Sequence, residues 1–273
     1  MTTEEVNSGL LGGLPAADRT LLIDPPLEVA IAEVRFGTEK SEISSEEAFL
    51  FRAVLEAGGT AFPRMEPALQ QQMQFDASSG LPPQVTTQSR GWQFVSFDSL
   101  VQVTLMPQML TLQTSKYERW STSVGSVLER LLGEVENLLQ PSVTNRIGLR
   151  YVDKFVDRDV NDASGWRGRI DDSFLGPIIH SSLGSLVIGG QQQLDLQLDP
   201  THGAVLRHGP FRDDSSGGSV SYLLDIDVYE ARADRFDVRT VLDSAEQLNR
   251  TALALFQSAV SHDYLKAMQG SAK

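Results

Sequence analysis

The sequence predicts an α+β fold in which long amphipathic helices cover one face of an antiparallel sheet. Short segments with the alternating apolar pattern of β-strands are joined by turns that are too short for parallel neighbours. Two longer segments carry apolar residues every three or four positions, as helices do. Strands followed by a helix occur twice along the chain, so the pattern also allows two similar strand-strand-strand-helix halves.

The composition is typical of a compact globular protein. Of the 273 residues, 41% are hydrophobic, which is enough for a sizeable core. The net charge of −13 argues against a general electrostatic attraction to nucleic acid or anionic lipid. The absence of cysteine excludes disulfides, thiolate metal sites and thiol nucleophiles. Because no segment resembles a membrane span or a secretory signal, we expect a soluble, cytoplasmic protein.

We divide the chain into five segments. Residues 1–20 are rich in Gly, Ser, Thr and Glu without an apolar period, so we expect a flexible leader. The other segments are a first α+β half at 21–156, a charged connecting segment at 157–180, a second α+β half at 181–265 and a flexible tail at 266–273. We interpret the connecting segment as a surface excursion or as the join between the two halves.

The first half begins with a strand and a short helix. After a Pro-Pro pair, Leu27, Val29 and Ile31 alternate with other residues, which predicts a strand. The segment SSEEAFLFRAVLEAGG then predicts a helix with Ser44 or Ser45 as its N-cap and a Gly-Gly stop.

Three strands and a long helix follow. Between residues 81 and 114, the segments WQFVSF, LVQVTLM and MLTLQT are separated by short turns, which predicts an antiparallel meander. The segment STSVGSVLERLLGEVENLLQP predicts a long helix that ends before Pro141. Its apolar stripe consists of Val124, Val127, Leu128, Leu131, Val135, Leu138 and Leu139.

The next segment, NRIGLRYVDKF at 145–155, predicts a strand with one apolar and one basic face. The apolar face holds Ile147, Leu149, Tyr151 and Phe155, and the basic face holds Arg146, Arg150 and Lys154. In an acidic chain, a row of three cations needs either an anionic partner or internal counter-charges. Counter-charges are present on two later predicted strands, at Asp195, Asp199, Asp225 and Asp227, so both interpretations stay open.

The second half repeats the order of strands and helix. The segments QQQLDLQLD, GAVLRHG and SYLLDIDVYEA predict three strands. A helix is predicted from about Val238 to His262, because its apolar residues recur every three or four positions. These residues are Val241, Ala245, Leu248, Ala252, Leu255 and Ala259.

Four motifs, in this order and spacing, resemble those of a sporadically distributed bacterial family of unknown function. They are PPLEVAIAEVRF, WQFVSFDS, LTLQTSKYERW and RIGLRYVDKF, between about Leu22 and Phe155. The terminal amphipathic helix is similar as well. The chain has Asp153 where the family motif has Asn. The resemblance implies a fold and a bacterial origin but no reaction, because the family has no established chemistry.

Metal and cofactor sites are not predicted. The run Asp157, Asp159, Asn161 and Asp162 begins like a calcium loop, but it lacks the Gly and the closing Glu that such a loop needs, so we expect a solvated loop. The four histidines, His180, His202, His208 and His262, lack the spacing of a helical metal site. No nucleophile elbow, phosphate loop or dinucleotide turn occurs, so we name no catalytic residue and no cofactor.

The leading interpretation is a non-catalytic binding or accessory module of a bacterial system. Its basic strand face would bind an acidic protein partner or a small anion, without general binding to nucleic acid or membrane, and a homodimer is compatible with the sequence. The predicted contact residues are Arg146, Arg150 and Lys154, with the loop residues Trp166, Arg167 and Arg169 as neighbours. Arg and Trp are favoured anchor residues at interfaces.

The alternative interpretation is an enzyme or a small-anion-binding protein, so whether the chain is catalytic stays open. In that case Arg150 and Asp153 would share a pocket, with Arg150 holding an anionic substrate and Asp153 transferring a proton. Asp153 lies on an otherwise apolar strand face, where burial would raise the pKa of its carboxyl group. A pocket in which the two residues converge with a histidine would favour this alternative, whereas an open face would favour the binding module.

Overall fold

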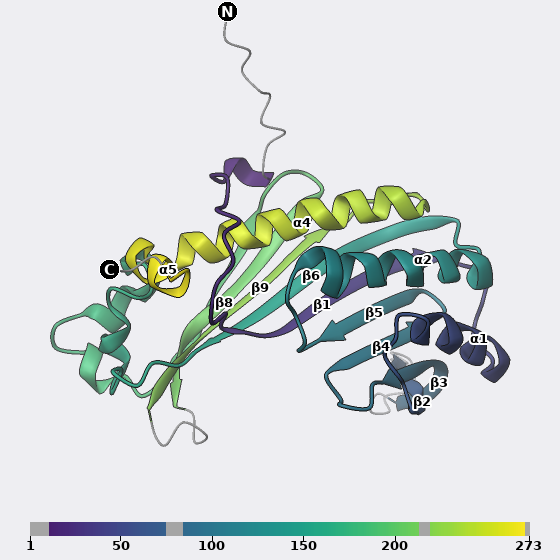
Figure 1. Cartoon of the computed structure of the whole chain (residues 1–273), viewed down its shortest axis with the longest axis horizontal. Helices are drawn as coiled ribbons and strands as arrows, with labels where there is room; N and C mark the ends of the chain where they lie inside the picture. The colour runs from purple at the N-terminus through teal and green to yellow at the C-terminus, as the bar shows by residue number, and fades with distance from the viewer. Residues whose placement is uncertain (1–10, 75–83, 213–218, 271–273) are drawn as a thin grey trace, which may run out of the picture. The chain divides into compact units, whose positions relative to one another are not determined.

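The computed structural model describes residues 11–74, 84–212 and 219–270, and of 70–74 and 84–88 it describes the backbone only. The strands are β1 (Leu27–Gly37), β2 (Arg64–Gln74), β3 (Gln84–Val95), β4 (Val101–Met106), β5 (Met109–Thr114), β6 (Val143–Phe155), β7 (Gln192–Gln197), β8 (His202–Arg212), β9 (Val220–Glu230) and β10 (Asp234–Arg235). The α-helices are α1 (Ser45–Glu56), α2 (Ser126–Leu139), α3 (Asp172–Leu175), α4 (Val238–Ala259) and α5 (His262–Met268). These elements confirm the predicted α+β class (Figure 1).

The described strands are hydrogen-bonded in the order β2-β3-β4-β5-β1-β6-β9-β8-β7, and β10 pairs with β6. Contacts divide the chain into two compact units. Unit 1 comprises Met1–Ala30, Gly148–Ala231 and Ser244–Lys273, and unit 2 comprises Ile31–Ile147 and Arg232–Asp243. The two units do not coincide with the predicted halves, because β1, β6 and α4 each contribute residues to both units.

Unit 2 contains the predicted meander. Strands β3, β4 and β5 pair antiparallel with their neighbours, and β2, which the sequence analysis did not predict, pairs antiparallel with β3. Helices α1 and α2 contact each other (Figure 1). The stripe of α2 is buried, as predicted, at Leu128, Leu131, Val135 and Leu139.

Strand β1 differs from its prediction in the face that it buries. Ala30, Ala32, Val34 and Phe36 are buried, whereas the predicted apolar face with Leu27 is only half-buried. The sequence did not predict this buried face, because alanine is less hydrophobic than branched residues and contributes little to an apolar pattern.

Helix α1 begins with a capping box, and Ser44 is the N-cap. The Ser44 hydroxyl accepts a hydrogen bond from the Glu47 N–H, and the Glu47 carboxylate accepts one from the Ser44 N–H. We expect Ser44→Ala to lower the free energy of unfolding by about 1 kcal/mol, because the Glu47 N–H loses its acceptor and the Glu47 carboxylate loses the hydroxyl donor. Urea unfolding measures this loss. Ser45→Ala is the matched control, and an equal loss in Ser45→Ala would contradict the assignment of the cap.

In unit 1, α4 covers one face of the strands (Figure 1). The six residues of its predicted stripe are buried, which confirms that prediction. The Tyr151 hydroxyl donates a hydrogen bond of 2.9 Å to the Asn249 side chain, and the Phe155 ring stacks on Phe256. The helix therefore lies against the apolar face of β6.

Segments predicted to be loose are packed in unit 1. The connecting segment buries six apolar residues rather than forming a surface excursion: Val160, Ala163, Trp166, Ile170, Leu175 and Ile178. In the predicted leader, Leu11 is buried, and residues 1–10 lie outside the described part of the chain. The predicted tail is helical as far as Met268, because α5 follows α4 after a new N-cap at Ser261. Residues 271–273 lie outside the described part.

Candidate functional site: a charged sheet face in unit 1

The face of the unit 1 strands opposite α4 carries a group of charged residues, which we name the charged face. It comprises Arg150 and Lys154 on β6, Arg207 on β8, and Asp225 and Asp227 on β9. Side chains alternate between the two faces of a strand, so Arg150 and Lys154 point away from α4, because Tyr151 and Phe155 contact it. Arg207 lies directly opposite Asp225 in the β8–β9 register and therefore shares its face.

Asp225 is the centre of the charged face. Its carboxylate accepts two hydrogen bonds of 2.7 Å from Arg150, one from Nε and one from Nη2. Arg207 Nη1 lies 3.5 Å from the same carboxylate on its other side. A planar guanidinium group matches a carboxylate in this bidentate arrangement. One acidic group thus holds two arginines on one sheet face.

Exposure differs strongly between these partners. The side chain of Asp225 is 4% exposed, whereas that of Arg150 is 44% exposed and that of Arg207 is 30% exposed. The hydrogen bonds to Asp225 raise the pKa of Arg150, against the opposing effect of partial burial. The buried carboxylate therefore holds two guanidinium groups whose side chains are partly exposed to solvent.

The predicted row of three cations is divided between the two units. Arg146 belongs to unit 2, where its Nη1 donates a hydrogen bond of 3.0 Å to Glu33. Arg150 and Lys154 belong to unit 1. Lys154 and Asp227 also interact with neighbouring groups. Internal counter-charges therefore account for Arg146 and Arg150, and among the predicted acids Asp225 is the partner of Arg150.

The three predicted loop residues lie in different environments. Trp166 is completely buried: its indole N–H donates to the Val220 carbonyl at 3.1 Å, so it belongs to the core and is not an exposed anchor. Arg169 donates a hydrogen bond of 2.6 Å to Asp157 and is half-buried. Arg167 is exposed, 3.7 Å from Asp172. The structure does not bring the three together as one exposed surface.

Asp153 is buried on the opposite face of β6 from Arg150. It lies between Tyr151 and Phe155 along that face, beneath α4, and is 4% exposed. Burial, with a smaller contribution from the negative charge of Asp225, raises the pKa of Asp153 to about 8. This confirms the predicted direction of the shift. Arg150 and Asp153 point to opposite faces, however, so they do not converge on one pocket.

The acidic run and the histidines take structural roles. Asp157 pairs with Arg169, and the Asp162 carboxylate accepts hydrogen bonds from the backbone of Ser164 and Gly165. Among the described residues, no group of three or more acids and histidines is arranged to hold a metal ion. His208 is buried, and its Nδ1 lies 2.8 Å from the Tyr222 hydroxyl.

His202 interacts with the turn that precedes β8. Its Nδ1 lies 2.8 Å from an oxygen of Asp199. Burial alone would raise the pKa of Asp199, but hydrogen bonds from His202 and from the backbone of Thr201 lower it to about 2. The pair stabilises the turn between β7 and β8.

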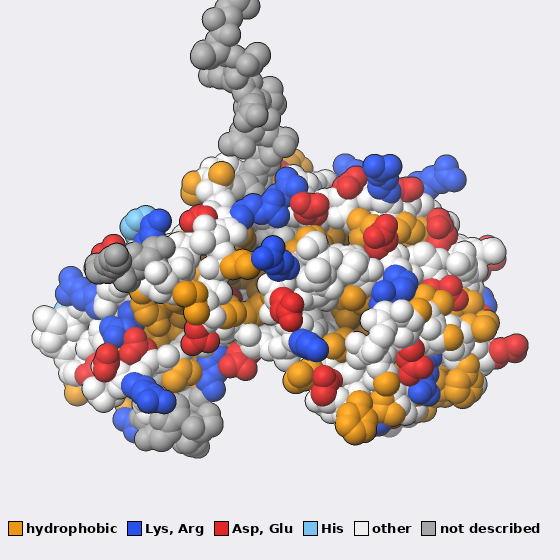
Figure 2. Space-filling model, viewed as in Figure 1, with side chains coloured by type: hydrophobic (Ala, Val, Ile, Leu, Met, Phe, Trp, Pro, Cys, Tyr) orange, Lys and Arg blue, Asp and Glu red, His pale blue; other side chains and the backbone are white. Residues whose placement is uncertain are grey.

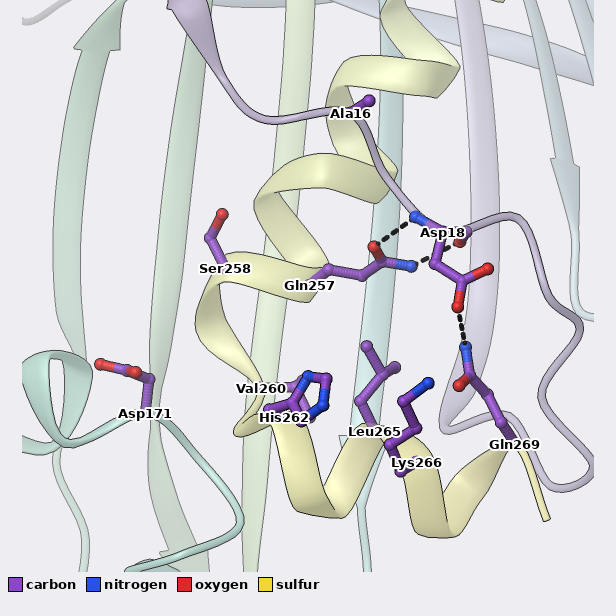
Figure 3. A pocket seen from close by; sticks show the side chains of 10 residues that line it. All are labelled: Ala16, Asp18, Asp171, Gln257, Ser258, Val260, His262, Leu265, Lys266 and Gln269. Atoms are coloured by element: carbon purple, nitrogen blue, oxygen red, sulfur yellow. Dashed lines mark hydrogen bonds between the residues drawn. The ribbon is translucent and has the colours of Figure 1, made fainter. Parts of the chain in front are cut away.

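A pocket of about 370 Å³ lies where the N-terminal segment passes over α4 and α5 (Figure 3). The Asp18 N–H donates to the Gln257 side chain at 2.8 Å, and the Gln269 side chain donates to the Asp18 carboxylate at 3.0 Å. His262 and Lys266 add charged or titratable groups to the lining. Sequence reasoning missed this pocket, because the N-terminal segment has no periodic pattern that predicts its position.

Acidic and basic side chains are interspersed on the face shown in Figure 2. None of the helices in the described ranges combines the length and the apolar composition that crossing a membrane requires. Comparison with models of known protein families finds no match, and no curated protein sequence matches this chain.

Proposed function

We propose that this protein is a non-catalytic binding module that recognises an acidic protein partner through the charged face of unit 1. The observation that carries the proposal is the buried carboxylate of Asp225, which holds Arg150 and Arg207 in fixed positions on an exposed sheet face. Pre-positioned guanidinium groups lose little side-chain entropy on binding a carboxylate. Lys154 extends the same face along β6 by one further cation.

The alternation of side chains on β6 favours this function over an enzyme. Catalysis by Arg150 and Asp153 would require both groups to reach one substrate. They lie on opposite faces of the strand, and Asp153 is buried beneath α4. A binding face needs no such convergence, so the open arrangement supports the binding module.

The proposal includes a cellular setting. The resemblance to the bacterial family supports a bacterial accessory role, and the cysteine-free composition fits the reducing cytoplasm. The net charge of −13 supports a specific local contact instead of general binding to nucleic acid.

The test uses variants that leave the Arg150–Asp225 pair intact. We expect the double variant Lys154→Gln/Arg207→Gln to bind its partner about tenfold more weakly, because each exposed ion pair contributes up to about 1 kcal/mol. Native mass spectrometry of the protein, gently purified from its own host, measures the partner-bound fraction. The proposal predicts a stoichiometric acidic protein bound to the wild type and a clearly smaller bound fraction in the double variant.

Arg250→Gln is the control for the Arg207→Gln change, because Arg250 is exposed on α4, away from the charged face, and each of these two changes removes one positive charge. It should retain the partner. Equal partner occupancy in all three proteins would contradict the proposed face. A bound small anion in place of a protein would support the alternative of an anion-binding protein.

A further inference from the structure

Strand β7 forms one edge of the described sheet. It pairs antiparallel with β8 and stands last in the strand order. The β7–β8 register from Gln192 to Gln197 contains no shift. Five of the six β7 residues are exposed. An edge of this kind presents a row of backbone groups to another chain.

The register identifies the outward-facing backbone groups. The Gly190 N–H donates to the Pro210 carbonyl at 3.0 Å, and the Leu198 N–H donates to the His202 carbonyl at 3.0 Å. In an antiparallel pair, residues that exchange hydrogen bonds alternate along the strand, so the even-numbered residues of β7 bond to β8. The N–H and C=O groups of Gln193, Asp195 and Gln197 therefore point away from the sheet.

The edge has few of the features that normally prevent pairing. Soluble proteins protect edge strands with Pro, Lys, a β-bulge or an inward-pointing charge. The sequence QQLDLQ of β7 has no Pro and no Lys, and Asp195 is its one charged residue. The apolar side chain of Leu194, in the middle of β7, is 43% exposed, and that of Ile188, four residues before the start of β7, is 69% exposed. The edge therefore offers both hydrogen bonds and apolar contact.

We propose that β7 pairs with β7 of a second copy of this chain, antiparallel, about a two-fold axis at Leu194. Each Leu194 then faces Leu194 of the other copy, and each Gln193 faces Asp195 of the other copy. The outward backbone groups belong to odd-numbered residues, and this register pairs odd-numbered residues with each other, as a hydrogen-bonded ladder requires. Within one copy the Gln193 carboxamide already donates to Asp195 at 3.1 Å. Its second N–H can donate to the Asp195 carboxylate of the other copy across the interface.

The neighbouring registers are less complementary. An axis at Asp195 places two carboxylates directly opposite each other, which is destabilising. An axis at Gln193 places Leu194 opposite the polar side chain of Gln192. The axis at Leu194 alone among these three combines an apolar pair with two amide–carboxylate pairs. This self-complementarity is the reason for choosing a second copy as the occupant of the edge.

The dimer has a consequence for binding. A two-fold axis in an antiparallel ladder runs perpendicular to the sheet, so each face of the sheet stays on the same side in both copies. The charged faces of two copies would therefore point in the same direction and act as a bivalent surface. The dimer itself does not depend on the proposed function, because its contacts involve β7 only.

The test uses a charge swap at the axis. Light scattering of the full-length wild type should give twice the chain mass of 29.9 kDa. Leu194→Lys and Leu194→Glu should each give 29.9 kDa, because two like charges then face each other. An equimolar mixture of the two variants should return to the dimer mass, because unlike charges meet at the axis.

A monomeric wild type at micromolar concentration would overturn the proposal. Two other results would also overturn it: both single variants remain dimeric, or their mixture stays monomeric. Mixing the Lys and Glu variants can restore the dimer only if residue 194 of one copy faces residue 194 of the other. A variant without residues 1–10 that dimerises when the full chain does not would show that the chain's own N-terminus covers the edge, which also overturns it.

Hydrogen exchange provides an independent readout that does not require a folded variant. In the dimer, the amides of Gln193 and Asp195 should be protected along with those of Leu194 and Leu196. In a monomer, the two odd-numbered amides would exchange quickly. The protection of the Gln193 and Asp195 amides should also fall on dilution. The protection of the Leu194 and Leu196 amides, which bond to β8, should not change.

Discussion

Replacing Asp153 with Asn is expected to remove a large pH dependence from the stability of this protein. The carboxyl group is buried beneath α4, and burial raises its pKa from 3.8 to about 8. A shift of this size corresponds to a difference on the order of 5 kcal/mol between the free energies of unfolding at low and high pH. The Asn variant has a similar shape but no titrating group.

The direction of this effect follows from proton binding. Between about pH 4 and pH 8, folded Asp153 holds a proton that the unfolded chain has lost. The stabilising contribution is therefore complete below pH 4 and is lost as the pH rises through about 8. At pH 8 and above, the Asn variant should be more stable than the wild type, because a buried amide costs less than a buried carboxylate.

Urea unfolding at a series of pH values measures this difference. Other acids contribute their own pH dependence, so the informative quantity is the wild-type free energy of unfolding minus that of the variant. Asp159→Asn is the matched control, because Asp159 is an exposed acid in the same unit. Parallel stability curves for the wild type and Asp153→Asn would contradict a raised pKa at this position.

Arg150→Met should destabilise the protein by about 3 kcal/mol, because it leaves the buried carboxylate of Asp225 without its bidentate partner. Arg207→Met should cost at most about 1 kcal/mol, because Arg207 lies 3.5 Å from Asp225 and its other hydrogen bond, 3.1 Å from Nε to the Gln193 side chain, is exposed. The double variant Arg150→Met/Asp225→Leu should be more stable than Arg150→Met alone. When both charged groups are removed, no buried carboxylate is left without a partner.

These three variants form a test that separates a structural from a binding role. Thermal and urea unfolding give the stability, and the partner-bound fraction gives the binding. Equal costs for Arg150→Met and Arg207→Met would show that Asp225 is not held mainly by Arg150. The single variant Asp225→Leu completes the comparison. If the double variant loses as much stability as Arg150→Met and Asp225→Leu together, Arg150 and Asp225 do not interact.

Several features could be predicted from the sequence because they depend on residues close together in the chain. An N-cap at Ser44 or Ser45 could be predicted because a cap depends on the next few residues only, and the structure selects Ser44, whose capping box is completed by Glu47. The buried stripe of α4 follows from its three- and four-residue spacing. The raised pKa of Asp153 follows from an acidic residue among apolar neighbours on one strand face.

Other features could not be predicted, because they depend on contacts between distant segments. The Asp225 partner of Arg150 is 75 residues away, and four acids were equally plausible until the strand register selected one. Trp166 has the composition of an interface anchor, but tertiary packing places its ring in the core against Phe155 and Tyr222. The N-terminal segment has no period, so its position is known only from tertiary contacts such as the hydrogen bonds from Gln257 and Gln269.

The sequence by itself determined the α+β class, the main helices and the two-sided character of β6, because backbone periodicity and local capping act within a few residues. The tertiary structure alone decided which charges pair, which face of β1 is buried and that β7 lies at an edge of the sheet. Those properties depend on strand order and register, which are set by burying apolar faces from distant parts of the chain against each other.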